Sequence, residues 1–203
     1  MPAVTTSIPV DARPALAHVN LMVDTFISNS SVEDLRSIVR SMLATGTPNL
    51  AASFTAAART RLRQTNGKPV PNARVLFTRH PSHISPSPQL HETLMRARSL
   101  YGAGLGFASL GVLTTIVKAS IGLRWEEEGD MADILAEIDA DIGQAIQSSK
   151  EEIEGGRVND FTSARDVVTD LRLAINESYS DVQSWGGEFP FERAFCSLDC
   201  WKI

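Results

Sequence analysis

The sequence predicts an all-α fold, a bundle of six to seven helices forming a single domain over residues 1–203. Apolar residues recur at helical spacing in six segments, and cap residues, often followed by proline, stand at their starts. The composition, 43% hydrophobic and 21% charged, is that of a globular chain able to bury a core. We expect N-terminal helices over 14–65, a proline-rich loop over 66–88, C-terminal helices over 89–184 and an aromatic tail over 185–203.

Three helices are expected before residue 66. The first begins at Pro14, because proline suits the first turn of a helix, and carries an apolar stripe to Ile27. After a break at 28–31, Ser30 and Glu33 match a capping box, and Gly46 should stop that second helix in a left-handed conformation. Thr47 and Pro48 start a third helix that ends near 66–67.

The segment 66–88 contains five prolines, which remove hydrogen-bond donors and disfavour helix in the preceding residue. We expect a long irregular loop with one short extended piece over 75–78. Long loops in compact domains are often functional, so a site beneath this loop is one alternative.

Four helical stretches follow the loop. Ser87 and Pro88 restart helix, and the apolar run 107–123 marks a central buried helix. The longest helix is expected over about 130–154, ended by two glycines, and Asn159 or Asp160 caps the next one.

The last 25 residues differ from the rest, because six of the thirteen aromatic residues lie between Tyr179 and Trp201. They show no long helical period, and large rings bury much apolar surface. We expect the tail to pack on the parent bundle, or alternatively on a neighbouring subunit. The interaction candidates are Trp185, Phe189, Phe191, Phe195 and Trp201.

Charge is divided unevenly along the chain. Residues 51–100 hold eight basic residues against one acidic residue, whereas residues 101–203 hold eight against nineteen. Three interpretations are open: the two segments pair with each other, within one chain or across a dimer; the basic segment 59–98 binds nucleic acid or a phosphorylated ligand; or the asymmetry arises by chance. The anion-binding candidates are Arg59, Arg61, Arg63, Lys68, Arg74 and Arg79.

Two groups of residues could bind a metal, although both have a simpler interpretation. Three histidines lie close together in the sequence: His80, His83 and His91. They are either solvated loop residues or ligands of a metal ion. Asp133, Glu137 and Asp141 recur every four residues on one helix face, where water or Arg59, Arg63 or Arg98 could balance their charge.

Two further patterns are weaker. Gly102, Gly104 and Gly106 precede a helix N-terminus, where backbone N–H groups can hold an anion, but tight helix packing explains them as well. Cys196 and Cys200 share a helix face, and zinc would need two more ligands from elsewhere.

No catalytic motif is recognisable in the sequence. We therefore expect a non-enzymatic helical interaction or adaptor protein that can self-associate, binding a protein partner or a second copy, with no cofactor. The alternatives are a small helical enzyme or ligand-binding protein with its site under 66–88, and a nucleic-acid or phosphate-binding protein. With no signal sequence or apolar span, we expect no membrane association and an intracellular, cytoplasmic or nuclear location.

Overall fold

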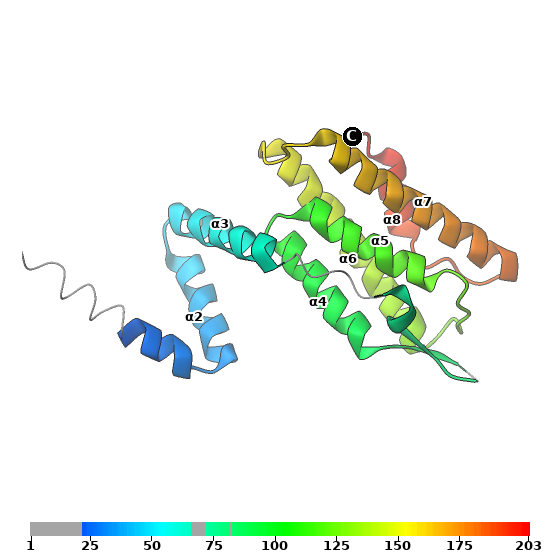
Figure 1. The fold of residues 1–203 in the computed structure, drawn as a ribbon, viewed down its shortest axis with the longest axis horizontal. Coiled ribbons are helices and arrows are strands. Elements are labelled where there is room, and N and C mark those ends of the chain that lie inside the picture. The colour runs from blue at the N-terminus through cyan, green and yellow to red at the C-terminus, as the bar shows by residue number, and fades with distance from the viewer. Residues whose placement is uncertain (1–21, 66–71, 82) are drawn as a thin grey trace, which may run out of the picture. The chain divides into compact units, whose positions relative to one another are not determined.

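The computed structural model describes residues 22–65, 72–81 and 83–203. Its contacts divide the chain into two compact units, one up to Ser53 and the other from Phe54 (Figure 1). The predicted all-α fold is confirmed, because helices make up almost all of the regular structure and the described strands form a single two-stranded sheet. The expectation of one domain over 1–203 stays a prediction, and the two units are described separately.

The N-terminal unit contains a helical stretch over 22–29, helix α2 (Val32–Thr45) and the start of α3 (Pro48–Thr65). The predicted capping box is one residue out of register: Ser31, not Ser30, accepts the Asp34 N–H and donates to the Asp34 carboxylate at 2.6 Å. Ser30 instead donates to the Phe26 carbonyl and closes the preceding helix. Residues 14–21 of the predicted first helix lie outside the described residues.

Gly46 ends α2, but not in the predicted left-handed conformation. Its φ of −78° is open to any residue, and its N–H donates to the Met42 carbonyl. Glycine is favoured here by space, because a Cβ would lie 2.5 Å from that carbonyl oxygen and 2.6 Å from the Leu50 side chain. The close approach therefore explains the glycine.

The C-terminal unit is organised around α5 (Gly106–Ser120), which packs against α4 (Pro88–Gly102), α6 (Asp130–Glu154) and α7 (Phe161–Trp185) (Figure 1). Leu110, Leu113, Ile116 and Val117 of α5 are fully enclosed. The predicted central buried helix is thereby confirmed. It begins one residue earlier and ends three residues earlier than the apolar run.

The ends of three helices follow the local signals in the sequence. Ser87 caps α4 ahead of Pro88, and α6 spans the residues predicted for the longest helix. Asp160 caps α7 by accepting the N–H groups of Thr162 and Ser163. Side-chain capping thus places the starts of α4 and α7, whereas α6 begins after Gly129 without a side-chain cap.

The described part of the proline-rich segment is not irregular, which corrects the sequence prediction. A short 3₁₀-helix η1 (Ala73–Val75) leads into strands β1 (Phe77–Arg79) and β2 (Ile84–Pro86), which pair antiparallel. Leu76 and Phe77 are buried in the core and anchor this hairpin. Pro86 is tolerated because it ends its strand, where one fewer donor is needed.

The aromatic tail contains a helix that the sequence analysis missed, α8 (Glu192–Cys200). It packs on α6 and α7 of its own unit, as the parent-bundle prediction requires. Phe191 is 0% and Trp201 7% exposed, whereas Phe195 is 38% exposed. Nine residues are too few for a clear apolar period, which explains the omission.

None of the helices in the described part of the chain is long and apolar enough to span a membrane.

The two tail phenylalanines should differ in their contribution to stability. Phe191→Ala removes a fully enclosed ring and should lower the free energy of unfolding by about 3–5 kcal/mol. Phe195→Ala, at a half-exposed ring of the same tail, should cost no more than about 1.5 kcal/mol. Urea unfolding measures both, and equal losses would contradict the burial of Phe191 in the core.

Candidate functional site

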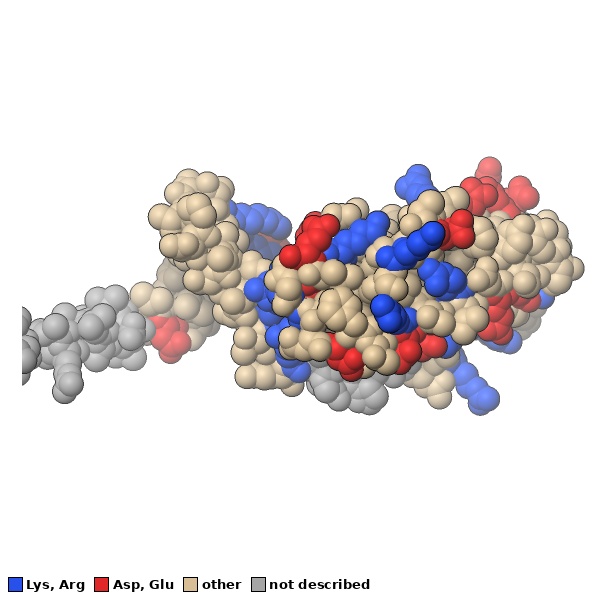
Figure 2. All heavy atoms as spheres, turned by 90° about the horizontal axis from the view of Figure 1, so that it is seen from above, with Lys and Arg blue, Asp and Glu red and all other residues tan. Residues whose placement is uncertain are grey.

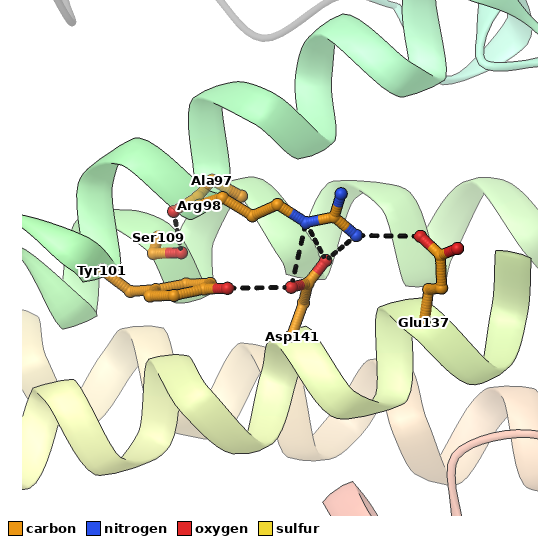
Figure 3. Close-up of polar contacts among 6 residues, drawn as sticks. All are labelled: Ala97, Arg98, Tyr101, Ser109, Glu137 and Asp141. Atoms are coloured by element: carbon orange, nitrogen blue, oxygen red, sulfur yellow. Dashed lines mark hydrogen bonds and ion pairs between the residues drawn. The ribbon is translucent and has the colours of Figure 1, made fainter. Parts of the chain in front are cut away.

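Two of the three predicted carboxylates on α6 bind one arginine (Figure 3). The Arg98 Nε of α4 donates to both carboxylate oxygens of Asp141, at 3.1 and 2.9 Å, and its Nη2 donates to Glu137 at 3.0 Å. The Asp141 side chain is 8% exposed and that of Glu137 57%. Asp133 is exposed and takes no part in this network.

Tyr101 completes the network from one turn further along α4. Its hydroxyl donates to the Asp141 carboxylate at 3.0 Å (Figure 3). Burial, and then the hydrogen bond to Asp141, raise the pKa of Tyr101, and the same carboxylate raises the pKa of Arg98. The phenol therefore stays a neutral donor and the guanidinium a cation, so the network ties α4 to α6 by charge-assisted hydrogen bonds.

The predicted histidine ligands do not converge. His80 and His83 stack in the turn of the hairpin, with ring centroids 4.6 Å apart, and the His80 N–H donates to the His83 carbonyl. His91 is exposed on α4. Within the described ranges, no three His, Cys, Asp or Glu side chains are grouped so that they could hold a metal ion. Cys196 and Cys200 are exposed free thiols.

Two carboxylates of α6 that the sequence analysis did not single out as functional cap other helices. Asp139 is buried and accepts the N–H groups of Arg193 (3.3 Å) and Ala194 (2.9 Å) at the start of α8. Glu152 is also buried and accepts the Phe107 N–H at the start of α5. No periodicity in the sequence could reveal these caps, because they join residues 45 to 55 positions apart.

The carbonyl ends of helices bind arginines from elsewhere in the chain. Arg59, an anion-binding candidate, donates to the Ala103 carbonyl after α4, and Arg157 donates to the Glu151 carbonyl at the end of α6. Arg172 donates to the carbonyls of Leu198 and Trp201 around the end of α8. A cation complements the negative end of a helix, so Arg59 has a structural role.

The remaining anion-binding candidates are spread over different places. Arg61 and Arg63 are exposed on α3, and Lys68 lies outside the described residues. Arg74 and Arg79 meet Lys118, which the sequence analysis did not select, around a hollow of about 410 Å³ beside the hairpin. On the face shown in Figure 2, acidic side chains of the described residues lie among and around the basic ones.

The aromatic interaction candidates lie mostly inside their own unit. Trp125 packs edge-on against Trp185, and Phe189 makes edge contacts with Phe191 and Phe195. Seven of the fourteen exposed large apolar side chains in the described residues lie in the N-terminal unit. These are Met22, Val23, Phe26, Ile27, Val32, Ile38 and Met42.

Comparison of the chain with protein-family models, with curated proteins and with solved structures gives no match.

Removing the arginine of the network should be more costly than removing its exposed partner. Arg98→Met leaves the buried Asp141 carboxylate without its ion pair and should lower the free energy of unfolding by about 1–3 kcal/mol, less than for a fully buried pair because Arg98 is partly solvated. Glu137→Gln, at an exposed side chain, should cost less than about 1 kcal/mol. Urea unfolding of both variants tests this order, and a larger loss for Glu137→Gln would refute it.

Asp139 should make stability depend on pH in an unusual direction. Burial raises the pKa of Asp139 above that of an unfolded aspartate, although the two backbone N–H groups and Arg193 oppose this and Glu192 adds to it. The folded state then binds the proton more tightly, so this group's contribution to stability falls as pH rises from about 3.9 through the folded pKa.

Asp139→Asn keeps an acceptor for the cap and does not titrate. Its melting temperature, relative to the wild type, should therefore rise between about pH 4 and pH 7. Asp139→Ala, which removes the cap at every pH, is the control and should be destabilised throughout. A melting temperature of Asp139→Asn that falls relative to the wild type over this range would show that the cap favours the charged form.

Proposed function

We propose that this protein is a helical interaction or adaptor protein that associates with a second copy of itself through residues 22–45. The observation that carries the proposal is the exposed apolar surface of these helices. Seven large apolar side chains there are between 38% and 62% exposed, and α2 buries none of its residues.

The exposed apolar residues of the C-terminal unit are arranged differently. They are spread over five elements, α3, η1, α4, α7 with three of them, and α8, around a core that is otherwise closed. Scattered residues of this kind are normal on a protein surface, whereas a concentration of them indicates an interaction site. The N-terminal helices therefore supply the docking surface in this proposal.

The area suits a symmetric pair. A large apolar side chain at half exposure leaves roughly 90 Å² uncovered, so the seven together leave about 600 Å². A two-fold interface uses the same patch on both copies, which doubles this to about 1,200 Å², the lower end of the range for specific interfaces. On α2 the opposite side is polar, with Glu33, Arg36, Ser37 and Arg40, so one face of the helix can dock while the other stays solvated.

Size-exclusion chromatography with light scattering, over a range of concentrations, tests the proposal. The wild-type chain should show twice its monomer mass at high concentration. Phe26→Glu and Ile38→Glu should each weaken association more than tenfold, because a charge would be buried in the interface. Ser37→Glu, on the polar side of α2, is the matched control and should leave the mass unchanged.

At a concentration where the wild type is also monomeric, circular dichroism should show the same helix content in all three variants, since these side chains are exposed in the single chain. A wild-type protein that stays monomeric at every concentration would overturn the proposal. So would a dimer that both glutamate variants leave intact.

A further inference from the structure

The hollow beside the hairpin is lined by three cations, which we call its wall, and by four apolar residues, which we call its floor. Arg74 of η1, Arg79 of β1 and Lys118 of α5 line it, so three elements each contribute one cation. The other lining residues are apolar, and none of those described is acidic: Ala73, Phe77, Ala119 and Leu123. Its volume of about 410 Å³ is within the range of small-molecule sites.

These three cations differ from five others in the C-terminal unit that bind groups of the chain itself. Arg98 and Arg124 bind carboxylates, and Arg59, Arg157 and Arg172 bind helix carbonyls. In the part of the chain that the structure describes, the side chains of Arg74, Arg79 and Lys118 bind neither a carboxylate nor a carbonyl. Lys118 also complements the last turn of α5, but Arg79, on a strand, has no such role.

The backbone beneath the cations is firmly held. Leu76 and Phe77 are buried between the two arginines, the Asn72 side chain accepts the Arg74 N–H, and the Ser87 hydroxyl donates to the Val75 carbonyl at 2.7 Å. The Ser87 N–H also donates to the Leu76 carbonyl. A site whose backbone is fixed before binding loses less conformational entropy when a ligand arrives.

We propose that this hollow binds a small organic phosphate, a phosphate monoester whose compact apolar group covers the floor. Two arginines and a lysine carry three positive charges, which favour a doubly charged phosphate, and guanidinium groups bind phosphate oxygens in pairs. Phe77 and Leu123 offer apolar surface to the rest of the molecule. The limited volume favours a small ligand over a nucleic acid, which needs an extended basic surface.

Isothermal titration of the full-length protein with phenyl phosphate tests the assignment, with inorganic phosphate and phenol as partial probes. Phenyl phosphate should bind saturably and more tightly than either. Arg79→Gln and Lys118→Gln should each weaken it about tenfold, the effect of losing a hydrogen bond to a charged group. Arg61→Gln is the matched control, because Arg61 is an exposed arginine outside the hollow.

A further variant tests the contribution of the apolar floor to binding separately from that of the cations. Ala119→Leu extends a lining side chain into the hollow and should weaken phenyl phosphate binding without changing the affinity for inorganic phosphate. The proposal is overturned if phenyl phosphate does not bind at millimolar concentration, or if Arg61→Gln weakens it as much as Arg79→Gln. Equal affinities for inorganic phosphate and phenyl phosphate would exclude a contribution of the apolar floor to binding. Tighter binding of a phosphoserine peptide or an oligonucleotide than of phenyl phosphate would exclude a small-molecule site.

Discussion

The C-terminal unit depends on α6 supplying the polar groups that the ends of neighbouring helices lack. The first N–H groups and last carbonyls of any helix have no partner within it, and burying them unpaired is costly. Asp139 accepts from the start of α8, Glu152 accepts from the start of α5, and the Ser148 hydroxyl donates to the Tyr101 carbonyl near the end of α4. The two carboxylates are thirteen positions apart on α6, which fixes the two capped ends about 20 Å apart along the helix. The positions of α4, α5 and α8 are therefore set together by one helix.

The start of α5 shows how closely this arrangement is packed. A Cβ on Gly106 would lie 2.3 Å from the Ser149 backbone nitrogen, so only glycine lets α5 begin against α6. Gly104 has a different reason, a φ of +77°, and Gly102 meets nothing within 4 Å. The sequence analysis considered an anion at this helix N-terminus as an alternative to tight packing. Gly106 supports the packing interpretation, and the Phe107 N–H at this N-terminus donates to the Glu152 side chain.

Local signals in the sequence predict most of the helices. The features that sequence analysis missed depend on contacts between residues far apart in the chain. Asp160 caps a helix within three residues of itself, and α6 has a long apolar period, so both could be predicted. Asp139 caps a helix 55 residues away, and the nine residues of α8 depend on that cap and on the burial of Phe191. The residues of the candidate anion site also fall into those that the sequence indicates and one that it does not. Arg74 and Arg79 were selected by charge, but Lys118 belongs to a helix that reads as buried core, and only the hairpin brings the three together.

The N-terminal helices lack the buried apolar core that stabilises the C-terminal unit. A helix of 14 residues such as α2 is marginal in isolation, and the Ser31 cap contributes only about 1 kcal/mol. The rest of its stability has to come from burying apolar surface, yet none of its residues is buried within the single chain. Docking of these helices is therefore coupled to their own stability, since each apolar side chain covered in an interface also stabilises the helix that carries it. The hollow beside the hairpin does not need a partner for its stability, because Leu76, Phe77 and Leu123 beside it are already buried in the core.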